Sequence, residues 1–417
     1  MSETRVIVIG GGVIGISAAY ELAVRGARVT VLERDELGAG ASFGNAGTVS
    51  PGHPPINKPG RVRRALRQML DPTSPLYIHP SWNPELWRWL WTFSRHCSGE
   101  HVERVMRVLA PLGHEALARF DALVEEEALE CGYRRDGYFD VCLSDAGLEE
   151  ARHEARMIEP YGYHPETLDE AGMHAAIPQL GGVVGGVYFP EAATMDPYRF
   201  LVELAARARS RSVDVREGEE VVDLTPTHGG VSVRTASGGV HAGDAALLAT
   251  GPFSLRLARK LGVRLPVQPG KGYHRDVDMA PDGAPLLEHA CVLHETSVFC
   301  TPMGGFVRFA GTMEFSGPNL TLRRARLEQL TRAARHYFPD LGTRPPRSEW
   351  CGLRPVSADG LPVVGPLPAA ENVVVATGHG MLGLTLAPAT GRLVADWILE
   401  GGPDPLYRAL APERFVN

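Results

Sequence analysis

The N-terminal part of the chain places two short apolar runs on either side of a glycine turn and a helical stretch. Residues 5–9 read Arg-Val-Ile-Val-Ile and residues 28–32 read Arg-Val-Thr-Val-Leu, which is typical of strands that are buried on both faces. The turn, residues 10–15, reads Gly-Gly-Gly-Val-Ile-Gly. This order predicts a strand, a tight turn, a helix and a second strand parallel to the first.

The glycine spacing is that of a dinucleotide-binding fingerprint. Gly10 permits the tight turn, Gly12 lets a pyrophosphate approach the backbone, and Gly15 allows close packing of the helix, whose N-terminal N–H groups attract phosphate. Glu33 follows the second strand, 18 residues after Gly15, where a carboxylate accepts hydrogen bonds from ribose hydroxyls. An unrelated glycine-rich turn would not explain strand, helix, strand and acid together. The predicted phosphate and ribose contacts are Gly10, Gly12, Val13, Ile14, Gly15, Glu33 and Arg34.

The later hydrophobic pattern returns to this order near the middle and the end of the chain. Residues 245–249 are fully apolar and end in Thr250-Gly251 before another helical stretch. Residues 372–376 form an apolar run, residues 377–383 a glycine loop, and residues 384–399 a helical pattern. We therefore place all three segments in one nucleotide domain.

Segments with other patterns interrupt that domain. Residues 61–130 read as mostly helical, residues 138–143 alternate like a strand, and residues 266–349 read as strands with one helix. A chain of 417 residues is also longer than a single core usually serves. We expect a nucleotide domain from residues 1–60, 192–265 and 350–417, interleaved with a substrate domain from residues 61–191 and 266–349.

The composition is that of an ordinary globular enzyme, with 44% hydrophobic and 22% charged residues and a net charge of -7. Because the basic residues are scattered and form no stripe, we expect no nucleic-acid partner. The six cysteines lie far apart with no C-x-x-C pair, which predicts reduced thiols, no disulfide and no metal site in a cytoplasmic protein. Residues 6–24 are apolar but lack the basic flank and cleavage site of a signal sequence.

A segment at residues 82–93 contains four of the six tryptophans. On a helix, one apolar face would be formed by Leu86, Trp87, Leu90 and Trp91 and extended by Trp89 and Phe93. Burial is the commoner fate of such a face. The alternative is contact with a membrane surface or a partner subunit through residues 82–95.

Six motifs, in order along the chain, resemble those of one enzyme family. They are Gly10-Gly-Gly-Val-Ile-Gly15, Ser42-Phe-Gly-Asn-Ala-Gly47 with Ser50-Pro51, Ala249-Thr-Gly251, Pro269-Gly-Lys-Gly-Tyr273, Trp350-Cys-Gly-Leu-Arg-Pro355 with Asp359-Gly-Leu-Pro362, and Thr377-Gly-His-Gly-Met-Leu-Gly383. Together they resemble the D-amino-acid dehydrogenase small-subunit type of the FAD-dependent amine and amino-acid oxidases, the group of glycine, sarcosine and D-amino-acid oxidases. The resemblance implies an α/β fold, in which a Rossmann-type, glutathione-reductase-like FAD domain is interleaved with an α+β substrate domain built on an antiparallel sheet.

The resemblance also implies FAD contacts beyond the fingerprint. The loop at residues 38–51 is too rich in glycine and alanine for a stable helix or strand, and it would pass over the flavin face. Val221 matches the adenine-side valine of the family, although a plain core valine is an equally good account. The implied contacts are Ser42, Asn45, Ala46, Gly47, Val221, Thr250, Gly251, Gly378, Gly380, Met381, Leu382, Gly383 and Leu384.

Four residues are candidates for substrate chemistry. Arg354 is expected to bind a substrate carboxylate, because a guanidinium matches a carboxylate in bidentate fashion; the alternative is an internal ion pair with an acid such as Asp359. His379 is expected to contact the flavin, or to act as an acid or base. Tyr273 is a candidate to share the carboxylate with Arg354, and Lys271 a candidate to tune the flavin ring.

The chain departs from its oxidase relatives at one point. Where glycine oxidases place a carboxylate-binding tyrosine before Thr301-Pro302, this chain has Val298-Phe299, so that second anchor is in doubt. His53, His274 and Arg308 are further pocket candidates, for which surface or core positions are equally good accounts.

The resemblance implies FAD-dependent oxidation of a D-amino acid, or of a D-proline-type secondary amine, by hydride transfer to the flavin. The products would be an imine and then a 2-oxo acid, with the electrons passing to a quinone, to oxygen or to another acceptor. The protein would be cytoplasmic, or peripheral on the inner face of the cell membrane. Alternatives are a sarcosine- or glycine-type amine oxidase that uses oxygen, the flavin subunit of a multi-subunit hydroxyproline or opine dehydrogenase, and an NAD-dependent dehydrogenase, which would not need the loop at residues 377–383.

Overall fold

The glycine fingerprint folds in the predicted order. The computed structural model describes residues 3–68, 74–80, 82–278, 286–342 and 344–415. In it, β1 (Arg5–Ile9) leads through the turn into α1 (Val13–Val24) and then into β2 (Arg28–Leu32). β1 and β2 pair in parallel, and Gly12 is the N-cap of α1. Because a glycine has no side chain to cap the helix, the start of α1 is not closed by its own cap residue.

β1 and β2 belong to a six-stranded sheet with the order β19-β20-β13-β1-β2-β9. Its strands are parallel except for β19, which runs antiparallel to β20. Along β1, Val6 and Val8 enter the core on one face, and Ile7 and Ile9 enter the core on the other. Burial on both faces explains the continuous apolar runs of the sequence. The remaining strands are β9 (Asp214–Arg216), β13 (Ala245–Leu248), β19 (Val363–Leu367) and β20 (Ala370–Thr377).

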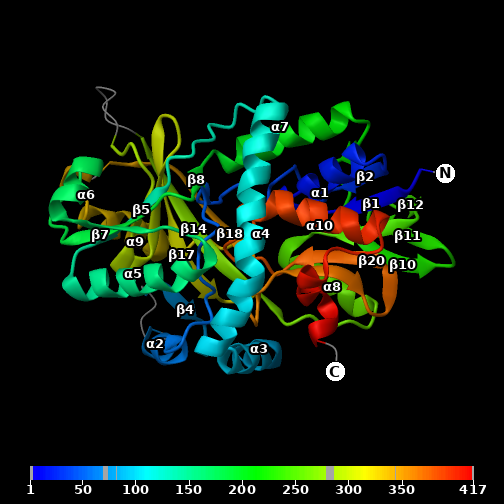
Figure 1. Ribbon diagram of the computed structural model, residues 1–417. Coiled ribbons are helices and arrows are strands. Elements are labelled where there is room, and N and C mark those ends of the chain that lie inside the picture. Colours follow the sequence, from blue (N-terminus) through cyan, green and yellow to red (C-terminus); the bar gives the residue numbers. More distant parts are fainter. Residues whose placement is uncertain (1–2, 69–73, 81, 279–285, 343, 416–417) are drawn as a thin grey trace.

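Helices cover one face of this sheet and a small antiparallel sheet covers the other (Figure 1). α7 begins where the sequence predicts, because Asp196 accepts hydrogen bonds from the N–H groups of Tyr198 and Arg199. The helical face carries α1, α7 (Pro197–Ser210) and α10 (Ala387–Leu399). The other face carries β10 (Val221–Thr227), β11 (Gly230–Thr235), β12 (Val240–Gly243) and α8 (Ser254–Lys260).

The second large sheet has the strand order β18-β14-β17-β16-β15-β5-β7-β6, and β4 pairs with β17. Adjacent strands are antiparallel except for β15 with β5 and β17 with β4, in agreement with the expected antiparallel sheet. The helix α9 (Arg324–Arg335) packs into its core. The strands are β4 (Leu76–Ile78), β5 (Tyr138–Cys142), β6 (Glu166–Asp169), β7 (Gly185–Phe189), β14 (Val267–Asp278), β15 (Cys291–Leu293), β16 (Val298–Pro302), β17 (Phe306–Phe315) and β18 (Pro346–Ser357).

The predicted boundary at residue 350 falls inside β18. This strand pairs with β14 from Val267 to Val277, so the chain enters the first sheet again only at β19. The pairing joins segments that are far apart in sequence, so the local hydrophobic pattern around residue 350 could not predict it.

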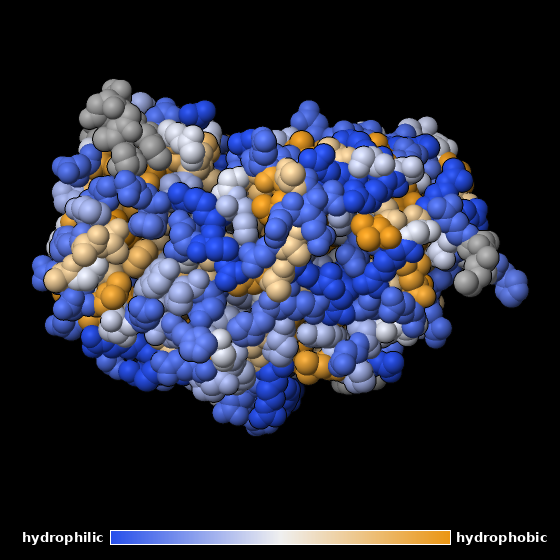
Figure 2. Space-filling view, turned by 45° about the horizontal axis from the view of Figure 1, so that its top comes forward, coloured by the Kyte–Doolittle hydropathy of each residue, from blue (hydrophilic) through white to orange (hydrophobic). Residues whose placement is uncertain are grey.

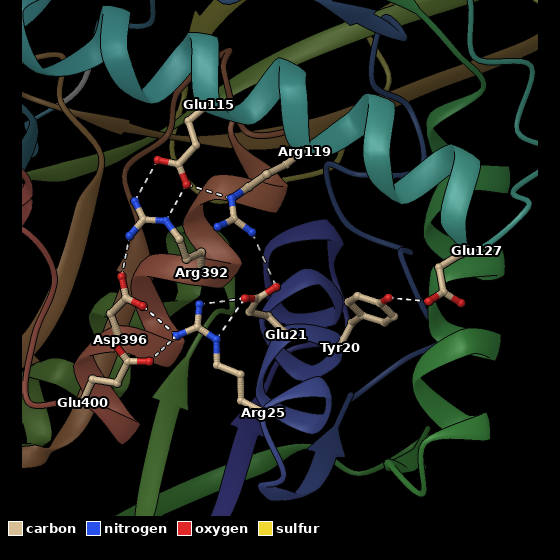
Figure 3. A network of polar contacts seen from close by, with 9 residues as sticks. All are labelled: Tyr20, Glu21, Arg25, Glu115, Arg119, Glu127, Arg392, Asp396 and Glu400. Carbon is tan, nitrogen blue, oxygen red and sulfur yellow. Dashed lines mark hydrogen bonds and ion pairs between the residues drawn. The ribbon is translucent and has the colours of Figure 1, made fainter.

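A long helix, α4 (Gly99–Glu126), crosses the molecule between α3 and α7 (Figure 1). An ion-pair network joins it to α1 and α10 (Figure 3): Arg392 of α10 donates to Glu115 of α4 at 2.8 Å, and Arg119 lies 3.7 Å from Glu21 of α1. The network fixes the fingerprint helix relative to the C-terminal helix. The other elements are α2 (Arg61–Gln68), α3 (Pro84–Arg95), α5 (Asp145–Ile158), α6 (Glu170–Ala176), β3 (Thr48–Val49) and β8 (Ala193–Thr194).

The tryptophan-rich helix α3 buries a different face from the one expected. Leu86 and Trp89 are buried in a core with Phe315, whereas Trp87 and Trp91 are 51% and 60% exposed. The indole N–H of Trp89 donates to a backbone carbonyl of β18 at 3.1 Å, which fixes this orientation. Elsewhere, the face seen in Figure 2 carries hydrophobic residues in small groups among hydrophilic ones. Within the described residues, no helix has both the length and the apolar character needed to cross a membrane.

Candidate active site

A cavity of about 460 Å³ extends from the glycine turn to β18 and is lined by residues of both large sheets. The structure brings most of the predicted FAD contacts to its walls, and with them Arg354 and His379. The predicted contacts that line it are Gly10, Gly12, Val13, Ile14, Glu33, Arg34, Ser42, Asn45, Ala46, Val221, Thr250, Gly251, Gly380, Met381, Leu382, Gly383 and Leu384. Gly15, Gly47 and Gly378 do not line it.

Two of the fingerprint glycines are required by close backbone approaches. Gly10 has a φ of +110°, and a Cβ there would lie 2.6 Å from the carbonyl oxygen of Ala249. A Cβ on Gly15 would lie 1.9 Å from the carbonyl oxygen of Gly10. Gly15 therefore contributes by allowing α1 to pack on β1, as the fingerprint implies, and not by touching the cavity.

Glu33 faces the start of α1 from the end of β2. Its carboxylate accepts hydrogen bonds from the N–H of Gly11 at 2.7 Å and from the N–H of Asp35 at 3.0 Å. These contacts hold the carboxylate at the cavity wall beside the glycine turn. This is the position from which an acid binds the ribose of a dinucleotide.

The loop at residues 42–47 is held against the second sheet by a buried ion pair. Arg308 and Asp276 are 6% and 3% exposed, and the guanidinium donates to both carboxylate oxygens, at 2.9 and 3.0 Å. Its remaining nitrogen donates to the carbonyl oxygen of Asn45 at 3.0 Å. His274 lies 3.2 Å from the carbonyl oxygen of Gly44, and burial lowers the pKa of its imidazole to about 4. Of the three open pocket candidates, Arg308 and His274 thus support the loop from outside the cavity.

Arg354 is a partly buried cation at the β18 end of the cavity. Its guanidinium donates to the carbonyl oxygen of Thr312 at 2.7 Å, and among the described residues it forms no ion pair with a carboxylate. The alternative of pairing with Asp359 is wrong, because Asp359 binds Arg414 at 2.8 Å. Burial lowers the pKa of Arg354 to about 10, so the group stays protonated at neutral pH.

Glycines in the sheet make room for Arg354 and for Trp350, both of which line the cavity. A Cβ on Gly272 would lie 2.3 Å from a terminal nitrogen of Arg354, and a Cβ on Gly352 would lie 2.1 Å from the Trp350 ring. Gly272 and Gly352 are opposite each other in the β14–β18 ladder. The two large side chains therefore lie flat on the sheet. Sequence reasoning assigned no role to Trp350 or these glycines, although their alternation in two strands was a usable signal.

His379 is a buried, neutral imidazole in the glycine loop after β20. It is 5% exposed, and its Nε2 lies 3.1 Å from the hydroxyl of Thr390 in α10. Burial lowers its pKa to about 3, which favours a contact role over proton transfer. The helix α10 begins at Ala387, later than predicted, and the N–H of Gly380 donates to the carbonyl of Pro355 at 2.7 Å. That N–H is therefore not directed at a ligand.

Lys271 and Tyr273 do not line the cavity, which corrects the roles suggested for them. Both lie on β14 with Gly272 between them, so their side chains leave the opposite face of the strand. The Tyr273 hydroxyl donates to Glu314 at 2.9 Å, and the Lys271 ammonium lies 3.2 Å from the same carboxylate. His53, the third open candidate, does line the cavity. Burial lowers the pKa of His53.

Comparison with known proteins decides the family. A family model described as FAD dependent oxidoreductase matches residues 5–397. The chain belongs to this family. It is 36% identical to a D-amino acid dehydrogenase of Methylobacterium nodulans over 99% of both chains. It is 33% identical to D-amino acid dehydrogenase 1 of Mesorhizobium japonicum, over 99% of this chain and 100% of the relative.

Solved structures show the same fold. Glycine oxidase from Geobacillus kaustophilus matches with a TM-score of 0.80 and 24% identity, over 99% of this chain and 100% of the oxidase. L-proline dehydrogenase from P. horikoshii matches with a TM-score of 0.76 and 18% identity, over 99% and 98% of the two chains. The predicted family, fold class and FAD cofactor are thereby confirmed.

The residues present fit FAD. Gly12 leaves the start of α1 without a side-chain cap of its own, although the N–H of Val13 donates to the Ser42 hydroxyl at 3.0 Å; this helix start suits a pyrophosphate, and Glu33 lies beside it for a ribose. The cavity continues from there, past the loop at residues 42–47, to the segment at residues 379–384. A flavin ring placed at that end would lie beside Arg354.

Proposed function

We propose that this family member is an FAD-dependent dehydrogenase that oxidises a D-amino acid, or a D-proline-type secondary amine, to an imine and hence to a 2-oxo acid. The observation that carries the proposal is the partly buried guanidinium of Arg354, which lines the cavity and forms no ion pair with a carboxylate among the described residues. The relatives named D-amino acid dehydrogenase, which match over the whole chain, support the same activity.

Arg354 would hold the substrate by its carboxylate. This ion pair would contribute strongly to the binding free energy, because a charge-assisted hydrogen bond is stronger where water is excluded. Fixing the carboxylate also orients the adjacent carbon, which must face the flavin. When bound, FAD supplies the acceptor for the hydride from that carbon.

The same end of the cavity would favour a neutral amine. The acidic side chains that line the cavity are Glu33, Asp35, Glu219 and Glu220, and they come from the end of β2 and the segment before β10. The charged group at the β18 end is Arg354, and a nearby positive charge in an apolar site lowers the pKa of a substrate ammonium. His379 and His53 are held neutral by burial and add no competing charge.

Anaerobic mixing of the purified holoprotein with D-amino acids, D-hydroxyprolines, sarcosine and glycine tests the proposal. We expect the flavin absorbance to bleach with at least one D-amino acid and not with its L-enantiomer. Arg354→Met should lower kcat/KM for that substrate by a factor that corresponds to about 2–5 kcal/mol, as for loss of one partner of a buried charged pair. Arg354→Lys is the matched control, because it keeps the charge but loses the planar fork. Bleaching by glycine or sarcosine alone would contradict the proposal.

The same preparation identifies the electron acceptor. We propose that the electrons pass to a quinone or a similar acceptor. Reoxidation of the reduced flavin is then expected to be faster with a soluble quinone than with air-saturated buffer. Fast reoxidation by oxygen with formation of hydrogen peroxide would instead establish an oxidase.

We further propose that α3 contacts an anionic membrane surface. Trp82, Trp87 and Trp91 are exposed on or beside this helix, and Arg88 and Arg95 are exposed among them. Aromatic side chains next to cations are typical of helices that lie in the lipid headgroup region. The protein should float with anionic vesicles, and replacing Trp87 and Trp91 by serine should abolish flotation. Equal recovery of both proteins in the soluble fraction would refute this contact.

A further inference from the structure

Lys271 is fully buried, yet its side chain does not line the cavity. Its exposure is 0%, and its ammonium lies 3.2 Å from the Glu314 carboxylate. It also donates to the side-chain oxygen of Asn319 at 2.7 Å and to the carbonyl oxygen of Thr321 at 3.1 Å. A buried ammonium has three donors to satisfy, and here two of them bind one short segment, residues 316–323.

Further hydrogen bonds hold the same segment. Asn319 donates to the carbonyl oxygen of Ser316 at 2.8 Å, and Ser316 donates to Glu314 at 2.6 Å. From β18, the thiol of Cys351 donates to the carbonyl oxygen of Leu320 at 3.3 Å. The backbone on both sides of Leu320 is therefore fixed from beneath.

The side chain of Leu320 forms part of the cavity wall. It is 56% exposed, although it lies on a segment with a buried anchor, and it lines the cavity together with Phe299, Trp350 and Arg354. Leu322, on the same segment, is 48% exposed and does not line the cavity.

We propose that Leu320 is a specificity-determining residue, which contacts the side chain of an amino-acid substrate held by Arg354, and that Lys271 is its positioning residue. The inference rests on the proposed function. A substrate with its carboxylate on Arg354 directs its side chain at the cavity wall, and an apolar wall favours a longer apolar side chain. A substrate as short as D-alanine would not reach Leu320.

Substitution of Leu320 tests the contact. With Leu320→Ala, kcat/KM for D-leucine and D-methionine should fall by about tenfold, the lower end of what apolar groups contribute in enzyme pockets, whereas kcat/KM for D-alanine should change little. Leu320→Met should retain the preference. The matched control is Leu322→Ala, which removes an equal side chain outside the cavity and should leave both values unchanged. An unchanged ratio of D-leucine to D-alanine in Leu320→Ala would overturn the assignment.

A double-mutant cycle tests the role of Lys271. Lys271→Met, and the milder Asn319→Ala should the first variant fail to fold, are expected to lower the D-leucine to D-alanine ratio in the same direction as Leu320→Ala. Combined with Leu320→Ala, neither should lower the ratio further. A purely structural role predicts loss of both activities with the ratio intact, which would refute the positioning role.

Failure of the proposed function gives a different result. If no D-amino acid bleaches the flavin of the unaltered protein, the activity itself is wrong. If D-amino acids do bleach the flavin but the ratio is insensitive to Leu320, only the present inference is wrong.

Discussion

Gly272→Ala should impair substrate binding by displacing the Arg354 guanidinium. A Cβ at this position would lie 2.3 Å from one terminal nitrogen of Arg354 and 2.4 Å from Cζ. Ordinary contact begins near 3.4 Å, so the guanidinium must move by 3.4 − 2.3 = 1.1 Å or more. Gly272 lies in the extended strand β14, where alanine meets no backbone penalty of its own.

A displacement of that size has a large expected effect. A misplacement of about 1 Å can lower a rate about 100-fold, and one hydrogen bond to a charged group contributes about 1.5–3 kcal/mol. We expect KM for the best D-amino acid to rise by about 10- to 100-fold, measured as the concentration dependence of flavin reduction in a stopped-flow instrument. FAD should still bind, because the fingerprint residues that face its pyrophosphate and ribose lie at the other end of the cavity.

Gly311→Ala provides the control. Gly311 is also buried in the second sheet, and a Cβ there would meet the carbonyl oxygen of Ser297 at 3.1 Å and Leu330 at 3.3 Å, away from Arg354. It should therefore produce a small change in stability and none in KM. If Gly272→Ala binds carboxylate substrates as tightly as the unaltered protein, the position assigned to the Arg354 guanidinium is wrong.

Three further outcomes follow from the contacts of the site. Glu33→Ala should weaken FAD binding by about tenfold, the value of a charge-assisted hydrogen bond, in a fluorescence titration of the apoprotein; equal affinity would refute its ribose role. Arg308→Met leaves a buried carboxylate unpaired and should lower the free energy of unfolding by about 3–5 kcal/mol in urea titrations, unlike Arg347→Met on the exposed surface. Burial lowers the pKa of His274 to about 4, below the unfolded value near 6.5. The unfolded chain therefore binds more protons between these values, so stability should rise with pH from 4 to 6.5 and should rise less in His274→Gln.

The sequence predicted the cofactor half of the site more fully than the substrate half. The fingerprint is largely local: a Cβ on Gly15 would meet the carbonyl oxygen of Gly10, and Glu33 accepts a hydrogen bond from the N–H of Gly11, so both contacts lie within one strand, turn and helix. The geometry of such a motif follows from its own short sequence. The same holds for the helix start at Asp196, where the cap and the proline are adjacent residues.

The substrate half depends on which strands pair, and a local pattern does not contain that information. Lys271 and Tyr273 share a motif with Gly272, yet strand alternation sends them away from Arg354 toward Glu314. Helix α3 shows the same limit. Several of its faces are apolar, and the buried one packs on Phe315 and donates a hydrogen bond from Trp89 to β18, contacts with residues far away in the sequence.

Three cations of the second sheet differ in whether a carboxylate lies beside them, and this difference leaves Arg354 available to a ligand. Lys271 lies beside Glu314, and Arg308 lies beside Asp276. Among the residues that the structure describes, Arg354 has only the carbonyl oxygen of Thr312 and the sulfur of Met313 within hydrogen-bonding range. A charge held away from water without a counterion costs stability, and under the proposed function the substrate carboxylate supplies that counterion. A bound carboxylate should therefore stabilise the folded protein by mass action, and the proposed specificity of the site for an acid follows from the same imbalance of charge.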